Sequence, residues 1–90
     1  MNIENKVAIV TGASKGIGKA TALALAEAGA HLAISARSKK LLEETAQEIR
    51  KMGREVLTFA GDMSVEDDIR QFINATVEKF DRIDILVNNA

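Results

Sequence analysis

The chain has 90 residues, of which 47% are hydrophobic and 28% are charged. This length and composition indicate one small folded domain or a piece of a larger one, because enough apolar surface exists to offset the entropy of folding. Twelve basic and thirteen acidic side chains leave a net charge of -1. Such a balance provides no positive field for nucleic acid or an anionic membrane, so we expect neither as a partner.

Several residue types are missing or rare. No cysteine is present and His31 is the single histidine, which excludes a disulfide framework and argues against a metal site. No apolar run approaches the ~18 residues of a membrane span, and the amino terminus lacks the apolar region of a signal peptide. These features favour a cytoplasmic protein. The chain also has no tyrosine, so chemistry that needs a tyrosine must come from elsewhere.

Short apolar runs alternate with helix-forming stretches along the whole chain. We expect strands over 7–10, 32–36, 55–60 and 83–87, and helices over 17–28, 39–52 and from Ser64 to Phe80. Strand and helix in strict alternation predict a parallel sheet with right-handed crossovers. The expected fold is a doubly wound α/β sheet, β-α-β-α-β-α-β, with helices on both faces.

Local signals mark the ends of these helices. Gly29 and Gly53 are placed to stop the first two helices, and Ser38 to cap the second. Ser64 begins a capping-box pattern with Asp67 at its fourth position. Apolar side chains then recur at helical spacing, which predicts one buried stripe made of Ile69, Phe72, Ile73, Val77 and Phe80.

The last expected strand is rich in β-branched residues and is followed by only three residues. A parallel strand of this kind is normally flanked on both sides, because an open apolar edge pairs with other chains. We therefore interpret residues 1–90 as the N-terminal part of a single larger domain.

Three glycines, Gly12, Gly16 and Gly18, lie between the first strand and the first helix. Glycines here let backbone N–H groups approach phosphate oxygens, and the helix N-terminus adds unpaired donors and partial positive charge. A Walker A loop is excluded, because it would need Gly at 13 and Ser or Thr at 20, and both are Ala. The spacing also differs from the standard dinucleotide fingerprint.

The spacing present, Thr11-Gly12-Ala13-Ser14-Lys15-Gly16-Ile17-Gly18, resembles that of the short-chain dehydrogenase/reductase family. Asn88-Asn89-Ala90 after the fourth strand and Asp62 after the third resemble two further motifs of the family. The resemblance covers all 90 residues and is greatest to bacterial 3-oxoacyl-[acyl-carrier-protein] reductases and related carbonyl or polyol reductases. It implies a Rossmann-type domain that binds a nicotinamide cofactor.

The residues after the second strand bear on which cofactor binds. NAD-binding sites of this kind carry an acidic residue there for the ribose 2′-OH, whereas this chain reads Ile34-Ser35-Ala36-Arg37-Ser38. An arginine can hold a 2′-phosphate through its fork of donors, and Lys15 adds a second cation. The pattern predicts NADP(H). The alternative is that Arg37 and Lys15 are ordinary solvated side chains.

The resemblance also implies roles for other residues. The Ile17 backbone N–H would bind the pyrophosphate and Ser14 would lie near the adenosine phosphate. Asp62 would accept from the adenine amino group with Met63 beside the ring. The alternative is that Asp62 caps the third helix, and the two roles could coexist. Asn89 and Ala90 would line the ribose region, and Asn88 would tie the fourth strand to its neighbours. The full predicted cofactor set is Gly12, Ser14, Lys15, Gly16, Ile17, Gly18, Arg37, Asp62, Met63, Asn89 and Ala90.

No catalytic residue can be assigned. In the family a Tyr, a Lys, a Ser and an Asn perform acid–base chemistry beside the cofactor, and none of the four matches a position here. The resemblance implies an oxidoreductase that interconverts a carbonyl and a hydroxyl group. It further implies a small-molecule or acyl-carrier-linked carbonyl substrate and a homo-oligomeric parent. The alternative is a non-catalytic nucleotide-binding or scaffold fragment.

Overall fold

The computed structural model describes residues 2–89. Strands and helices alternate in the predicted order, and their bounds agree with the predicted ones to within about two residues. The elements are β1 (Val7–Thr11), α1 (Gly16–Glu27), β2 (His31–Ala36), α2 (Lys39–Lys51), β3 (Val56–Ala60), α3 (Glu66–Phe80) and β4 (Ile85–Val87).

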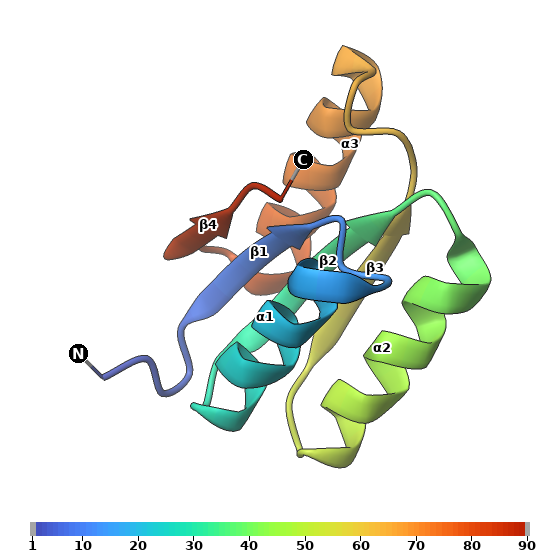
Figure 1. The fold of residues 1–90 in the computed structure, drawn as a ribbon. Helices are drawn as coiled ribbons and strands as arrows, with labels where there is room; N and C mark the ends of the chain where they lie inside the picture. Colours follow the sequence, from blue (N-terminus) through green and yellow to red (C-terminus); the bar gives the residue numbers. More distant parts are fainter. Residues whose placement is uncertain (1, 90) are drawn as a thin grey trace.

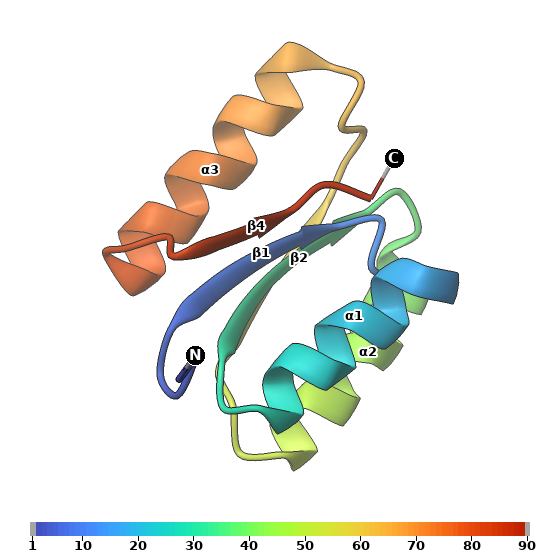
Figure 2. The same cartoon turned by 60° about the vertical axis from the view of Figure 1, so that its left-hand side comes forward.

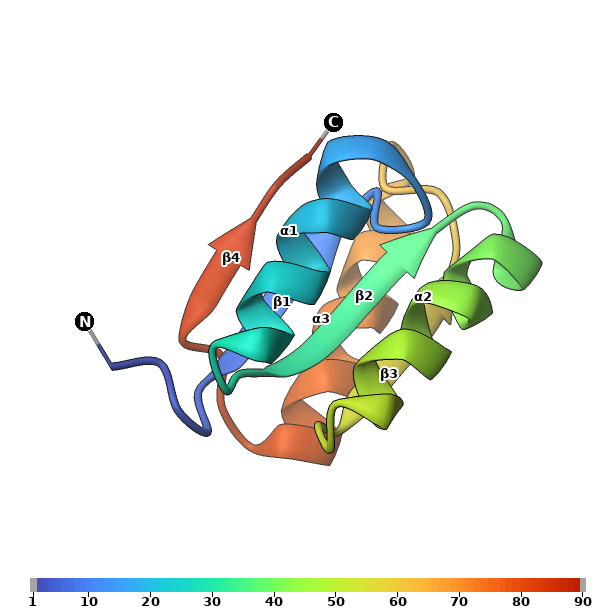
Figure 3. The same ribbon diagram turned by 60° about the horizontal axis from the view of Figure 1, so that its bottom comes forward.

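The strands form one parallel sheet in the order β3-β2-β1-β4. In Figure 1 the sheet runs through the middle of the molecule, and Figure 2 shows α1 and α2 on one face and α3 on the other. Figure 3 shows α1 and α2 side by side, with α3 behind the sheet. The doubly wound α/β fold predicted from the sequence is therefore confirmed. The order in which strands are added reverses between β1 and β4, because β2 and β3 lie on one side of β1 and β4 on the other. In such sheets ligands bind at the carboxyl ends of the strands beside this point.

The core has one layer on each face of the sheet. Every residue of β1 is buried, and so is every residue of β2 after His31, as expected for central parallel strands. Val10 and Ile34 pack against the helix pair, whereas Ile9 and Ala33 pack against Phe72 of α3. The two central strands are thus fixed from both sides, which makes their carboxyl ends a rigid base for a site.

The predicted ends of α1 and α2 are confirmed. Gly29 and Gly53 follow these helices with φ of +108° and +80°, the left-handed region that glycine adopts without a steric penalty. The Ser38 hydroxyl accepts a hydrogen bond of 3.2 Å from the N–H of Leu41, which caps α2 as predicted.

The predicted capping box of α3 is wrong. The helix starts one residue later than that pattern requires, with Val65 at the cap position and no side-chain cap. The Ser64 hydroxyl instead donates to Asp62 Oδ1 at 2.7 Å. When a serine hydroxyl is hydrogen-bonded to the side chain two residues before it, it stabilises a turn and does not cap the helix that follows.

The predicted apolar stripe of α3 is only partly buried. Phe72 is 1% exposed, but Ile69 and Val77 are 40% and 44% exposed. The strand at this edge of the sheet, β4, is only three residues long. Leu86 of β4 is itself 64% exposed. An apolar surface therefore lies along this edge of the described chain.

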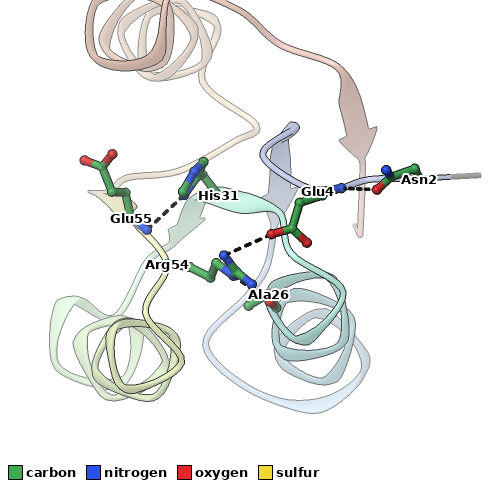
Figure 4. A network of polar contacts seen from close by, with 6 residues as sticks. All are labelled: Asn2, Glu4, Ala26, His31, Arg54 and Glu55. Atoms are coloured by element: carbon green, nitrogen blue, oxygen red, sulfur yellow. Dashed lines mark hydrogen bonds and ion pairs between the residues drawn. The ribbon is translucent and has the colours of Figure 1, made fainter.

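A polar network closes the amino edge of the sheet (Figure 4). Arg54 Nε donates to the Ala26 carbonyl in the last turn of α1 at 3.3 Å, and its guanidinium lies 3.6 Å from Glu4. The Glu55 N–H donates to His31 Nδ1 at 3.1 Å. His31 is half-buried at the amino end of β2, the end opposite to the glycine turn. It stacks on Phe80.

No helix in the part of the chain that the structure describes is long and apolar enough to cross a membrane. Within residues 2–89 no three His, Asp or Glu side chains gather as metal ligands would.

Candidate functional site

A cavity of about 880 Å³ opens at the carboxyl edge of the sheet, where the connections after all four strands converge. Its volume lies within the ~300–1,000 Å³ range of ligand pockets. Nine of the predicted residues line it, namely Gly12, Ser14, Lys15, Gly16, Ile17, Arg37, Asp62, Met63 and Asn89. Gly18 is not a lining residue, and Ala90 lies outside the described residues.

The turn between β1 and α1 requires its glycines for steric reasons. Gly12 and Gly16 have φ of +62° and +59°. A Cβ on Gly12 would lie 2.7 Å from the carbonyl oxygen of Asn89, and one on Gly18 would collide with the carbonyl of Gly12. Gly18 therefore acts by close approach of α1 to the turn, while Gly12 and Gly16 line the cavity itself.

Helix α1 presents its N-terminus to the cavity. It begins at Gly16 after Lys15, has no side-chain cap and has no acidic residue in its first turn. The N–H groups of a first turn have no acceptor within the helix, and they carry the positive end of the helix dipole. This end of α1 can therefore bind an anion. Ile17 is 77% exposed and lines the cavity.

Ala13 anchors the same turn to the rest of the fold. Its N–H donates to the Ser35 carbonyl at the end of β2, at 3.0 Å. Its carbonyl accepts from the hydroxyl of Thr45 on α2, also at 3.0 Å. Both Ala13 and Thr45 are fully buried. The turn is thus held from beneath while its outer surface faces the cavity.

Arg37 and Ser38 follow β2 at one end of the cavity. Arg37 is exposed, and within residues 2–89 the structure gives it no ion pair. Leu41, in the first turn of α2, lines the same end and is 39% exposed. This end therefore offers a cation, a hydroxyl and an apolar side chain to a bound molecule.

Asp62 follows β3 and is fixed by several hydrogen bonds. Its Oδ1 accepts from the N–H and the hydroxyl of Ser64 at 2.9 and 2.7 Å, while its own N–H donates to Asp68 Oδ2 at 2.8 Å. The bonds from Ser64 lower the pKa of Asp62 below its ordinary value, and the positive charge of Arg37 lowers it further. Asp62 is therefore an ionised acceptor at neutral pH. Asp62 therefore closes the turn before α3. It does not cap the helix itself, as was predicted, because Val65 is the cap residue and α3 has no side-chain cap.

The end of β4 is tied to the end of β1. The Thr11 hydroxyl donates to Asn88 Oδ1 at 3.2 Å and accepts from the N–H of Asn89 at 2.9 Å. The Asn89 amide also donates to the Gly12 carbonyl at 3.4 Å. Asn88 thus joins β4 to its neighbour, as predicted, and Asn89 brings the fourth connection against the glycine turn.

The sequence did not predict every residue that lines the cavity. Thr11, Ala36, Ser38, Leu41, Gly61, Ser64 and Asn88 line it as well. Most adjoin a strand end, which is the signal that could have included them. Leu41 lies within α2, and an exposed leucine in a first turn gives no sequence signal.

Comparison with known proteins gives a consistent family. Residues 6–90 match the family described as short chain dehydrogenase. An uncharacterized oxidoreductase of Thermotoga maritima is 47% identical over 90 residues, and a 3-oxoacyl-[acyl-carrier-protein] reductase of Synechocystis is 45% identical over 86. The two alignments include 100% and 94% of this chain, but only 35% of the length of either relative. A short-chain dehydrogenase/reductase homolog of Bacillus subtilis, YusS, is 43% identical over 91 residues, and the chain covers 84% of it.

Solved structures agree with this family and with the fold. L-sorbose reductase from Gluconobacter frateurii, in complex with NADPH and L-sorbose, superposes with a TM-score of 0.94 at 38% identity. NAD+-bound xylitol dehydrogenase superposes with a TM-score of 0.95 at 36% identity. All of this chain is covered in both cases, but only 35% of either neighbour. The four-stranded sheet therefore corresponds to about a third of the length of these two neighbours.

Proposed function

The chain belongs to the short-chain dehydrogenase family, and we propose that it is the cofactor-binding part of an NADP(H)-dependent oxidoreductase. In this proposal residues 1–90 are the N-terminal part of a single NAD(P)-binding domain. The complete protein interconverts a carbonyl and a hydroxyl group on a small-molecule or acyl-carrier-linked substrate. It functions in the cytoplasm as a homo-oligomer.

The observation that carries the proposal is the cavity at the carboxyl edge, which gathers donors and acceptors suited to a dinucleotide. The uncapped start of α1, at Gly16 and Ile17, suits the pyrophosphate, with Ser14 beside it. The ionised carboxylate of Asp62 suits the adenine amino group, with Met63 next to the ring. Asn89 would line the ribose region, continued by Ala90.

The choice of NADP(H) rests on local charge. One structural neighbour contains NADPH and another contains NAD+, so the fold alone does not discriminate. The exposed guanidinium of Arg37 and the ammonium of Lys15 line the cavity, and the segment from Ile34 to Ser38 contains no acidic residue. A carboxylate at this place would favour the 2′-OH of NAD, whereas cations favour a 2′-phosphate.

When bound, the cofactor supplies the hydride, and the protein supplies position and electrostatics. The residues of this chain bind and orient the adenosine and pyrophosphate parts. The chain has no tyrosine, so the acid–base group of the family would come from residues outside these 90. We therefore expect the 90-residue chain by itself to reduce no ketone with NADPH above a buffer control.

A second candidate is a non-catalytic nucleotide-binding or scaffold protein. It is favoured by the missing tyrosine and by the Bacillus relative, of which this chain covers 84%. Ketone-dependent oxidation of NADPH by the complete protein would support the enzyme. Cofactor binding without turnover of any carbonyl tested would support the second candidate.

A pair of glycine substitutions tests the cofactor site. Gly18→Ala places a Cβ against the Gly12 carbonyl, so we expect it to weaken NADPH and NADH binding by at least about tenfold. Gly53→Ala is the control, because Gly53 lies beyond α2 with open space around it, and its φ of +80° makes an alanine there strained without a collision. Backbone strain there costs about 1 kcal/mol of stability and should leave both Kd values unchanged. Wild-type affinity in Gly18→Ala would refute the site.

A further inference from the structure

We propose that Thr45 is a positioning residue for the phosphate-binding turn between β1 and α1. Its hydroxyl holds the Ala13 peptide so that the backbone donors of the turn stay aimed at the cavity. The inference rests on the proposed function in one respect, namely that a nicotinamide cofactor is the molecule bound at this turn.

The contact joins two distant parts of the chain. Thr45 lies in α2, 32 residues from Ala13, and its Oγ1 donates to the Ala13 carbonyl at 3.0 Å. Its buried neighbours on the same helix face, Leu42, Ala46 and Ile49, are all apolar. The Thr45 hydroxyl is thus the one polar side-chain group that α2 buries within the described residues, and it is directed at the glycine turn.

The turn needs such an anchor because flexible glycines lie close to Ala13 in the sequence on both sides. Gly12 and Gly16 both have positive φ, and glycine has access to more backbone conformations than any other residue. The Ala13 N–H is fixed by the Ser35 carbonyl, so the Thr45 hydroxyl fixes the other end of the same residue. Without it, a fully buried carbonyl would lose its donor, and the turn would relax to recover one.

The position of Thr45 on α2 also links the two ends of the cavity. Helix α2 starts directly after Arg37 and Ser38, which line the end proposed for the 2′-phosphate. About two helical turns further on, at Thr45, the same helix bonds to the turn proposed for the pyrophosphate. The pyrophosphate is common to NADPH and NADH. A change at Thr45 should therefore weaken both cofactors equally, unlike a change at Arg37.

The chain contains a matched control for removal of a buried hydroxyl. Thr76 is also fully buried, and its Oγ1 donates to a backbone carbonyl at 2.8 Å. Its acceptor is Phe72 of its own helix, α3, on the opposite face of the sheet. Thr45→Val and Thr76→Val thus remove the same group from equally buried sites, and only the first removes a bond to the turn.

The experiment measures Kd for NADPH and for NADH in the complete protein encoded by the gene. We expect Thr45→Val to weaken both by about five- to tenfold, Thr45→Ser to restore wild-type values, and Thr76→Val to change neither. Amide hydrogen exchange of Ala13 is followed in parallel without cofactor. It should accelerate in Thr45→Val and stay as in the wild type in Thr76→Val. If Thr45→Val does not fold, Thr45→Ala replaces it in both measurements.

The outcomes separate the two proposals. If wild-type protein binds neither cofactor while the Ala13 amide still depends on Thr45, the proposed function fails and the anchoring of the turn stands. If the wild type binds cofactor but Thr45→Val binds it equally well, Thr45 does not position the site. Equal losses in Thr45→Val and Thr76→Val would also overturn the inference, because they would reflect general destabilisation.

Discussion

Replacing Arg37 with Asp should reverse the cofactor preference of the complete protein. Arg37 is exposed at the rim of an open cavity and has no ion pair within the described residues. Its charge-assisted hydrogen bonds to a 2′-phosphate are therefore worth the lower end of the usual 1.5–3 kcal/mol, about 1.5 kcal/mol. An aspartate in its place would add repulsion of about 1 kcal/mol per pair of unit charges 4 Å apart in water.

The two effects together amount to about 2.5 kcal/mol, which corresponds to roughly sixtyfold weaker binding of NADPH. Neither effect applies to NADH, which has no 2′-phosphate, and the new carboxylate can accept from its ribose 2′-OH. Loss of the Arg37 charge also raises the pKa of Asp62. The hydrogen bonds from Ser64, the larger cause of its lowered pKa, remain, so Asp62 stays ionised at neutral pH.

The assay is fluorescence titration of both cofactors against the wild type and three variants. Lys15→Ala should weaken NADPH by a few-fold and spare NADH, since it removes only one supporting charge. Arg70→Asp is the charge-matched control, because Arg70 lies on α3 and its ion pairs are with Glu66 and Asp67. Equal weakening of both cofactors by Arg37→Asp would show that Arg37 supports the fold. A wild type that already prefers NADH would refute the assignment of NADP(H).

Three further predictions concern stability and association. Ser35→Ala should raise the free energy of unfolding in urea by about 1 kcal/mol, because the buried Ser35 hydroxyl has no hydrogen-bond partner among residues 2–89; a loss of stability would show that it does have one. The bonds from Arg82 and from the Val7 N–H lower the pKa of Asp84 below its ordinary value of 3.8, so their stabilisation is present above pH 3.8 and is lost as the pH falls through the folded-state pKa. Asp84→Asn should therefore destabilise the protein at neutral pH, with a difference from the wild type that disappears in acid; a constant difference in thermal melts would contradict this. The isolated 90-residue chain should self-associate in sedimentation experiments through its β4 edge, and Leu86→Lys should reduce this, whereas a monodisperse wild-type monomer would exclude it.

The sequence predicted those features that depend on short-range pattern. The run of β-branched residues in β1 predicted a buried strand, and the glycines after α1 and α2 predicted where those helices end. The capping box failed because the Ser64 hydroxyl has two possible partners, and only the folded turn selects Asp62. The role of Thr45 was missed because helical periodicity places it among apolar residues. Its acceptor, 32 residues away, is brought close only by tertiary structure.

Polar groups at the amino ends of the strands are hydrogen-bonded differently from those at the carboxyl ends. The two ends of helix α1 show the difference. Its C-terminus is closed by protein, because Gly29 and Ala30 donate back to the carbonyls of Ala26 and Leu25, and Arg54 adds a side-chain donor (Figure 4). Its N-terminus has no side-chain cap. The carbonyl groups at the C-terminus of α1 thus have donors within the protein, including the Arg54 guanidinium. The N–H groups at its N-terminus are left to bind solvent or a ligand.

Because of this difference, we expect substitutions at the amino ends of the strands to change stability and substitutions at the carboxyl ends to change cofactor binding. Substitutions in the amino-edge network, such as Arg54→Ala, remove contacts that the folded chain makes with itself and should act on unfolding free energy. Substitutions at the carboxyl edge, such as Arg37→Asp, remove groups that have no protein partner in the described chain and should act on cofactor affinity. The hydrogen bond between Thr45 and Ala13 belongs to both groups of contacts. It is made within the protein, but its acceptor lies in the turn that faces the cavity. For that reason affinity and stability should change together at Thr45 and separately at the other two sites.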